Sequence, residues 1–296
     1  MYFSAPEQTA KAFIDTGFRG VFCGAVNNFC GSPKLLEEHY VKLNSISPLI
    51  SYKPGFHAEY TTSLEIMEQI AALAQKYHAP VWCHNSETKS ETEGCISRYG
   101  KTPTELMESI GMFEYGGGGY HCVYFTENDM DIFRRHNMTA VTNPASNSKL
   151  ASGIADISSL MSHGINVAIG TDGAASNNAL DMFREMYLCT VLQKLRYSDA
   201  AAMPAENVLR AATLGGAKAM ELDCGSIEAG KLADFAVVDM RRPSMQPEND
   251  IVKNLVFSGS KDIIRMTAVG GKILYENGGF AGIDTEKLYH DCARIC

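Results

Sequence analysis

The feature that most constrains the fold is an alternation of short apolar runs with longer amphipathic stretches through the first 220 residues. Apolar runs typical of buried strands begin near residues 20, 48, 79, 120, 139 and 165. Stretches with helical spacing separate them; in residues 62–77, apolar positions recur every three or four residues. Because neighbouring parallel strands need crossover helices, the pattern predicts a parallel α/β sheet with helices outside.

Six strands fall short of the eight that close a (β/α)8 TIM-type barrel. The run Met1-Tyr2-Phe3 could be the end of a seventh strand, so we expect either an open sheet or a chain that starts inside a barrel. We assign residues 1–220 to this partial barrel. After residue 220, short strands at 235–238, 266–269 and 272–275 and a helix at 285–295 predict a small β portion over 221–296.

Composition narrows the classes of partner. The net charge of −8 and the lack of a clustered Lys/Arg run argue against nucleic-acid binding. No apolar run approaches the roughly 20 residues of a membrane span, and the N-terminus lacks the features of a signal peptide. Nine cysteines, without a Cys-x-x-Cys pair, are typical of reduced thiols, and we expect a cytoplasmic protein.

Polar residues follow five consecutive predicted strands, and the carboxyl ends of parallel strands meet at one edge. They are His57, His84, His121, Asn143 and Asp172. A single histidine at a strand end is more often structural than a ligand. Five such residues in register are harder to explain in that way, and two histidines with an aspartate suit Zn²⁺ or Fe²⁺. The sequence therefore predicts one mononuclear metal site at this edge.

Three local motifs have alternative interpretations. Glu87, three residues after His84, is either a proton-transferring carboxylate or a charge at a helix N-terminus. Asp172-Gly173 is typical of a hairpin, but a helix is expected to follow, which favours a strand-to-helix turn. The run 116–119, Gly-Gly-Gly-Gly, lacks the context of a phosphate-binding loop and is expected to be a flexible loop or a close backbone approach. Residues 143–147 are expected to form a turn.

Four segments together resemble the amidohydrolase superfamily, and most closely its methylthioadenosine/S-adenosylhomocysteine deaminases. They are His-Asn-Ser-Glu-Thr at 84–88, Tyr-His-Cys at 120–122, Asn-Pro-Ala-Ser-Asn-Ser-Lys-Leu at 143–150 and Gly-Thr-Asp-Gly-Ala-Ala-Ser-Asn-Asn at 170–178. Residues 225–239 resemble that family's C-terminal β-sandwich signature. The resemblance covers nearly the whole chain and implies a hydrolytic deaminase of small nucleoside-like molecules.

The resemblance also implies a role for each matching residue. His84 and Asp172 match metal ligands, and Glu87 and His121 match a proton-handling pair, with Asp172 also accepting a proton. His57 matches a histidine that contacts substrate, and we expect Glu87 and Asn143 to lie beside the substrate as well. The sequence departs from the family at residues 56–59, which read Phe-His-Ala-Glu where the family has Pro-His-Ser-Pro.

A larger departure concerns the family's first barrel strand, which ends in His-x-His and supplies two metal ligands. No His-x-His occurs in this sequence. We therefore expect a chain truncated at its N-terminus, and the alternatives are an inactive homologue or a split enzyme whose missing strand comes from another polypeptide. Guanine, cytosine or a chlorotriazine are alternative substrates. Because a barrel without one strand exposes sheet edges, we also expect a homo-oligomer.

Overall fold

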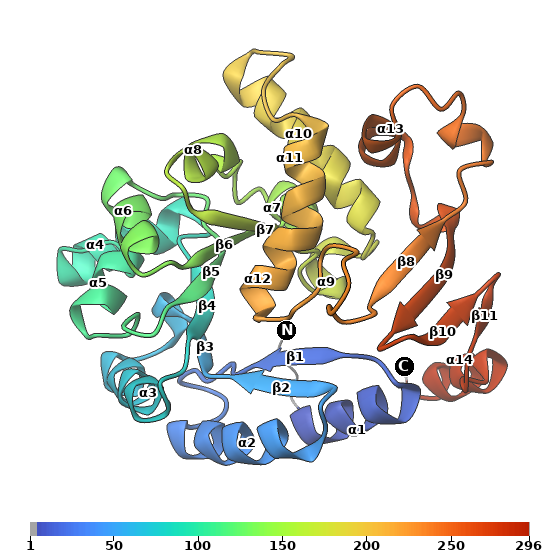
Figure 1. The fold of residues 1–296 in the computed structure, drawn as a ribbon. Coiled ribbons are helices and arrows are strands. Elements are labelled where there is room, and N and C mark those ends of the chain that lie inside the picture. Colours follow the sequence, from blue (N-terminus) through green and yellow to red (C-terminus); the bar gives the residue numbers. More distant parts are fainter. Residues whose placement is uncertain (1–4, 296) are drawn as a thin grey trace.

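The computed structural model describes residues 5–295, and its central feature is a curved parallel sheet (Figure 1). The parallel strands of this region are β1 (Gly20–Cys23), β2 (Ile50–Lys53), β3 (Gly55–Ala58), β4 (Val81–Asn85), β5 (Gly117–His121), β6 (Thr139–Thr142) and β7 (Asn166–Ile169). β1 pairs with β2, and β3 to β7 pair in chain order. A parallel bridge between Val26 and Phe56 connects the two groups. The described chain thus has the consecutive parallel strands of a barrel.

Helices cover the outer side of this arc (Figure 1). Those of the β/α region are α1 (Pro6–Thr16), α2 (Pro33–Ile46), α3 (Leu64–Tyr77), α4 (Lys89–Tyr99), α5 (Pro103–Ser109), α6 (Glu127–Arg135), α7 (Pro144–Lys149), α8 (Ile157–Ser162), α9 (Ala174–Asn177), α10 (Met182–Tyr197), α11 (Ala205–Arg210) and α12 (Gly216–Met220). Several begin at hydroxyl side chains that accept a backbone N–H, as Ser63 does for α3 and Thr88 for α4. No helix within residues 5–295 is both long and apolar enough to cross a membrane.

The structure differs from the predicted elements at several places. The single strand expected over 48–56 is two strands, β2 and β3, because Pro54 between them has no N–H for the sheet. The turn expected at 143–147 is instead the start of helix α7, with Pro144 in its first turn. Helix α4 was expected only in the alternative interpretation of Glu87 as a charge at a helix N-terminus. The proposed strand at Met1-Tyr2-Phe3 lies outside the described residues.

The glycine run at 116–119 belongs mostly to strand β5 and is not a flexible loop. A Cβ atom at Gly117 would lie 1.9 Å from the carbonyl oxygen of Val81, and one at Gly118 would lie 2.2 Å from the ring of Trp82. The alternative expectation, close backbone approach, is therefore correct. The absence of side chains allows β4 and β5 to pair in a register that places His84 opposite Tyr120.

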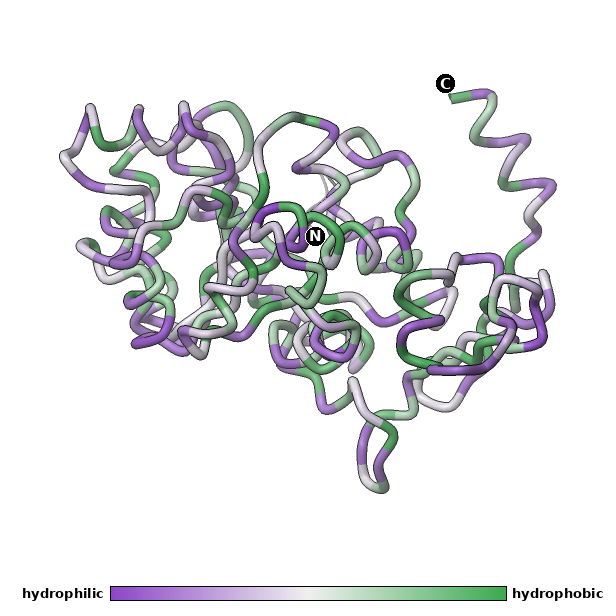
Figure 2. The backbone as a smooth tube through the Cα atoms, turned by 90° about the horizontal axis from the view of Figure 1, so that it is seen from above, coloured by the Kyte–Doolittle hydropathy of each residue, from purple (hydrophilic) through white to green (hydrophobic). Residues whose placement is uncertain are grey.

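The C-terminal part is an antiparallel sheet in the order β11-β10-β9-β8. Its elements are β8 (Phe235–Val238), α13 (Ile251–Ser258), β9 (Ile264–Val269), β10 (Lys272–Glu276), β11 (Gly279–Phe280) and α14 (Thr285–Ala293). Figure 2 shows the C-terminal helix projecting from the rest of the molecule. A partly buried ion pair of 2.5 Å between Arg19 and Asp234 connects this part to the β/α region.

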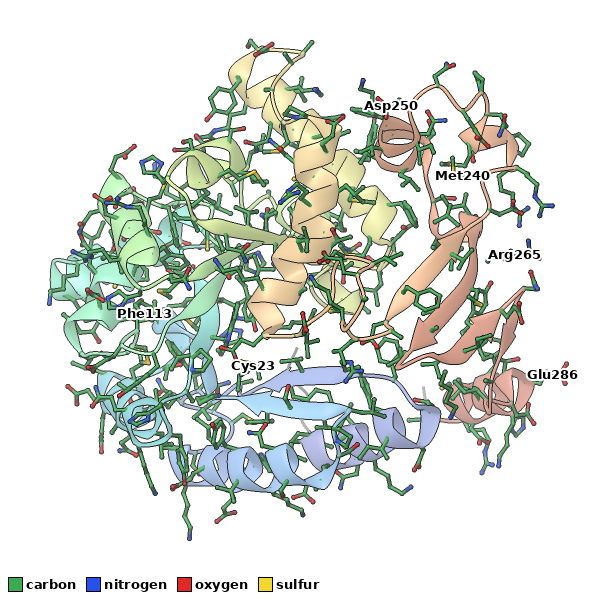
Figure 3. The ribbon with its side chains drawn as sticks, in the orientation of Figure 1. Cys23, Phe113, Met240, Asp250, Arg265 and Glu286 are labelled. Carbon is green, nitrogen blue, oxygen red and sulfur yellow. The ribbon has the colours of Figure 1, made fainter. Side chains whose placement is uncertain are left out.

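The main core lies between the parallel strands and their helices. Phe113, which is 1% exposed, packs there on the outer side of the strands, whereas Arg265 and Glu286 lie at the periphery of the C-terminal part (Figure 3). The eight cysteines within residues 5–295 are free, and most are buried. This agrees with the expectation of reduced thiols.

Candidate metal centre and active site

The parallel topology places the five polar strand ends at one edge of the sheet. His57 lies in β3, His84 in β4 and His121 at the end of β5. Asn143 directly follows β6, and Asp172 lies three residues after β7. Helix α9 begins two residues after Asp172, so the Asp-Gly pair is a strand-to-helix turn and not a hairpin.

Three of these residues form a group that could hold a metal ion. The ligand atoms of His84, His121 and Asp172 all lie within 4.8 Å of one another. The two imidazole rings are stacked, with centroids 5.3 Å apart. Two imidazoles and one carboxylate are ligands that suit zinc or ferrous iron. His121, which the sequence assigned to proton handling, thus lies within the same group as the two predicted ligands.

The surroundings of His84 keep its imidazole in the neutral form that can bind a metal ion. Its Nδ1 lies 2.7 Å from the carbonyl oxygen of His57, so Nδ1 carries the proton and donates it. The lone pair is then on Nε2, which is the form that coordinates a metal. Burial, together with the neighbouring His121, lowers the pKa of His84 to about 4. The imidazole is therefore neutral at physiological pH.

His121 is oriented by a buried amide. Its Nδ1 lies 2.7 Å from Oδ1 of Asn147, an atom that can only accept, so Nδ1–H donates and Nε2 holds the lone pair. Nε2 lies 3.7 Å from a carboxylate oxygen of Glu87. The backbone at His121 has a φ of 74°, in the left-handed region that residues other than glycine seldom adopt. Nε2 of His121 therefore faces the candidate ligands His84 and Asp172 as well as the carboxylate of Glu87.

Asp172 is held as an anion by two hydroxyl groups. Its Oδ2 accepts hydrogen bonds from Ser176 at 2.6 Å and from Ser146 at 2.7 Å. Burial alone would raise the pKa of Asp172, but these hydrogen bonds and the N–H of Gly173 outweigh it, and the pKa is lowered. Its φ is 57°, also in the left-handed region. An ionised carboxylate therefore faces the two imidazoles.

Glu87 lies in the loop between β4 and α4, immediately before the cap residue Thr88. One of its carboxylate oxygens accepts a hydrogen bond of 2.9 Å from Ser152, and the other faces His121. The loop is fixed by Glu91, which accepts backbone N–H groups from residues 86, 87 and 88. Glu91, not Glu87, occupies the first turn of α4, and Glu87 is directed toward the candidate centre.

A cavity of about 440 Å³ opens beside the group. Its wall includes His84, Tyr120, Asn143 and Asp172, with Gly170, Thr171, Gly173, Ala175 and Ser176 around the last. This volume is in the range of small-molecule sites. His57 is not among the residues that line it; its ring lies 4.8 Å from that of His84, and its Nδ1 lies 2.8 Å from the hydroxyl of Thr61.

Sequence reasoning missed the residues that support the centre. Asn147, Ser146, Ser176 and Ser152 are each hydrogen-bonded to one of the predicted residues. Three of the four lie within the family-like runs at 143–150 and 170–178, but their hydrogen-bond partners did not follow from their local sequence. Their partners lie 26 or more residues away, except that Ser176 is four residues from Asp172.

Comparison with known proteins gives a consistent picture. The model of the amidohydrolase family matches residues 5–274. A 5-methylthioadenosine/S-adenosylhomocysteine deaminase of Clostridium tetani is 41% identical over 302 residues, which is 100% of this chain and 70% of that protein. A 5'-deoxyadenosine deaminase of Methanosarcina acetivorans is 36% identical over 98% of this chain and 69% of its own length.

Among solved structures, an adenosine deaminase from Xanthomonas campestris with bound zinc superposes with a TM-score of 0.92. It is 30% identical and covers 99% of this chain, which spans 69% of that protein. A guanine deaminase of C. acetobutylicum has a TM-score of 0.78 over 90% of this chain and 68% of its own, at 22% identity, and shares the fold.

Proposed function

Because the chain belongs to the amidohydrolase family, we propose that it is a hydrolytic deaminase that removes the amino group of an adenosine-type nucleoside. The observation that carries the proposal is the group formed by His84, His121 and Asp172, with the carboxylate of Glu87 beside it. The names of its relatives support 5'-methylthioadenosine and S-adenosylhomocysteine as the first substrates to test. The cavity of about 440 Å³ suits the nucleoside portion of either molecule.

We propose that His84 and Asp172 are ligands of one Zn²⁺ or Fe²⁺ ion. The donor set fits such an ion because the imidazole is neutral and presents Nε2, while the carboxylate is ionised. The zinc-bound Xanthomonas neighbour supports zinc. When bound, the ion would act as a Lewis acid and lower the pKa of water toward neutrality.

The side chains around the centre have complementary tasks in this proposal. Glu87 would take one proton from the attacking water and deliver it to the adenine ring nitrogen, and it would later carry the second proton to the departing amine. The hydrogen bond from Ser152 fixes one oxygen of that carboxylate and leaves the other directed toward His121. Nε2 of His121 would orient the attacking water, and Asp172 would accept the second proton of that water before Glu87 carries it to the departing amine. The products are the hydroxylated ring and ammonia, so a C–O bond replaces a C–N bond.

Substrate contacts would come from His57 and Asn143. Asn143 lines the cavity directly, whereas His57 would act from strand β3, next to His84. Burial lowers the pKa of His57, so this side chain is neutral near pH 7 and offers a hydrogen bond instead of a charge.

The test measures ammonia release and the change in adenine absorbance with the zinc-loaded chain and both nucleosides. Glu87→Gln should lower turnover by about 10²-fold or more while the metal content stays at one per chain, because only proton transfer is lost. Glu93→Gln is the matched control, since Glu93 is an exposed carboxylate on α4. A protein with stoichiometric metal that deaminates neither nucleoside would refute the proposed substrates, and guanine, cytosine and a chlorotriazine would then test the alternatives.

We also propose that the chain forms a homo-oligomer. Large apolar side chains are exposed in the C-terminal part, including Ile227 at 92%, Tyr289 at 69% and Phe280 at 49%. Exposed apolar side chains form an interaction surface where they lie together, and we propose that these do so. Sedimentation of the intact chain would measure the state, and a monodisperse monomer at micromolar concentration would contradict the proposal.

A further inference from the structure

A fully buried glutamate lies behind the candidate centre and has no part in the proposed chemistry. Glu185 is on helix α10, with 0% of its surface exposed. Within residues 5–295 no ion pair to a basic group is formed by its carboxylate. Burying a carboxylate without a cation is costly, so neutral donors must stabilise it. Burial raises the pKa of Glu185, and its hydrogen bonds oppose that rise.

The two oxygens of this carboxylate are hydrogen-bonded to two different short helices. Oε2 accepts the backbone N–H of Ala145, in the first turn of α7, at 2.9 Å. Oε1 accepts the side-chain N–H of Asn177, in α9, at 2.6 Å. The second N–H of that amide donates to the carbonyl oxygen of Thr171, next to Asp172, at 2.6 Å. Asn177 itself is only 3% exposed.

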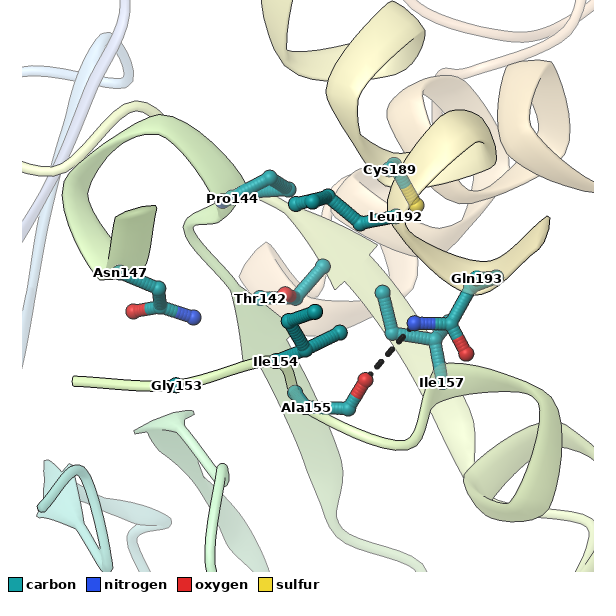
Figure 4. Close-up of a pocket in the computed structure, with 10 residues that line it drawn as sticks. All are labelled: Thr142, Pro144, Asn147, Gly153, Ile154, Ala155, Ile157, Cys189, Leu192 and Gln193. Carbon is teal, nitrogen blue, oxygen red and sulfur yellow. Dashed lines mark hydrogen bonds between the residues drawn. The ribbon is translucent and has the colours of Figure 1, made fainter. Parts of the chain in front are cut away.

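Both helices carry the groups that are hydrogen-bonded to His121 and Asp172. Helix α7 contributes Asn147, which accepts the Nδ1–H of His121, and Ser146, which donates to Asp172. Helix α9 contributes Ser176, the second donor to Asp172. Figure 4 shows α10 lying against this region, with Pro144 and Asn147 on one side and Cys189 and Gln193 of α10 on the other.

We propose that Glu185 is a positioning residue that fixes the distance between helices α7 and α9, whose side chains hold His121 and Asp172 in place. The inference rests on the proposed function for its effect on catalysis, since Glu185 touches neither ligand and acts through α7 and α9. One carboxylate has two acceptor oxygens and can bind both donors at once, which a neutral amide cannot. The arrangement therefore couples the orientation of the imidazole to that of the carboxylate.

The test compares Glu185→Gln with Thr190→Val in the full-length chain. The glutamine has one oxygen and one NH₂ group. Either α7 or α9 therefore meets a donor instead of an acceptor and loses its hydrogen bond. Thr190 is also fully buried on α10, but its hydroxyl donates to the carbonyl of Met203, away from the centre. The valine thus removes one buried hydrogen bond from the same helix without affecting α7 or α9.

Two measurements distinguish this inference from the proposed function. Nitrogen-15 NMR of the metal-free protein reports the tautomer of His121, and Glu185→Gln should replace the single Nδ1–H form by a mixture, whereas Thr190→Val keeps it. Zinc affinity, measured by competition with a chelator, should fall about tenfold in Glu185→Gln and less than about twofold in Thr190→Val. Wild-type protein without deaminase activity would refute the function, while the tautomer comparison would still decide the role of Glu185.

A folded Glu185→Gln protein with the wild-type His121 signal would overturn the inference, whatever its zinc affinity. An equal loss in Thr190→Val would also overturn it, because the effect would then be general destabilisation of α10. If Glu185→Gln does not fold, Asn177→Ala removes the other half of the bridge and should change the His121 tautomer in the same way. An unchanged tautomer in that variant would refute the coupling.

Discussion

Acidification should weaken the fold of the metal-free protein through His84. Burial and the neighbouring His121 lower the pKa of His84 to about 4, whereas a histidine in an unfolded chain titrates near 6.5. Above pH 6.5 the imidazole is neutral in both states and adds no pH dependence. Below it, the unfolded chain binds a proton that the folded chain does not, so the free energy of unfolding falls until about pH 4.

The expected magnitude follows from the gap between the two pKa values. A difference of about 2.5 units, at about 1.4 kcal/mol per unit, corresponds to a loss of about 3 kcal/mol by pH 4. Between pH 6.5 and pH 5 the loss is about 2 kcal/mol by the same reasoning. This is a large share of the stability of an ordinary domain.

Urea denaturation of the chelator-treated protein at several pH values measures this loss. Other groups titrate in the same range, so the relevant quantity is the difference between wild type and His84→Asn, which should shift by about 2 kcal/mol between neutral pH and pH 5. His290→Asn, at an exposed histidine of α14, controls for the loss of an imidazole. A wild-type minus His84→Asn difference that stays constant over this range would refute the reasoning.

Three further substitutions test the packing and hydrogen bonds around the centre. Asn147→Leu leaves the buried Nδ1–H of His121 without its acceptor and should lower the free energy of unfolding by about 1–3 kcal/mol; an unchanged urea midpoint would contradict this. Ser176→Ala removes a donor to Asp172 and should raise the pKa of that carboxyl group, as measured by carbon-13 NMR titration of the metal-free protein, and an identical midpoint would count against it. Gly118→Ala would place a Cβ atom 2.2 Å from a tryptophan ring and 2.5 Å from a backbone carbonyl, so it should destabilise the protein by about 1–3 kcal/mol in the same denaturation assay; a stability equal to wild type would show that the strands can separate.

The strand positions were largely predictable because each apolar run is a local signal. Runs near residues 20, 79, 139 and 165 correspond to β1, β4, β6 and β7. The run at 48–56 has the apolar continuity of one strand, but Pro54 has no N–H and divides it into β2 and β3. Helix α7 was mistaken for a turn because Asn-Pro is typical of both a turn and a helix start.

Only the residues of the candidate metal group itself could be predicted from the sequence. Parallel topology brings strand ends together, so His84, His121 and Asp172 could be placed near one another without coordinates. Most of the supporting contacts could not be anticipated, because they join residues far apart in the chain. Glu185 is one such case, since its hydrogen bond to Ala145 spans 40 residues and a helical position in α10 reveals nothing about it.

The left-handed backbone at His121 and Asp172 has a consequence for evolution in the laboratory. Each such residue holds about 1 kcal/mol or more of conformational strain, which glycine would relieve. A selection that rewards heat resistance alone would therefore favour glycine at these two positions and would discard the imidazole and the carboxylate. At these two positions a gain in thermal stability would cost the proposed activity. A more heat-resistant variant should therefore be sought among substitutions in the outer helices, with these two codons held fixed.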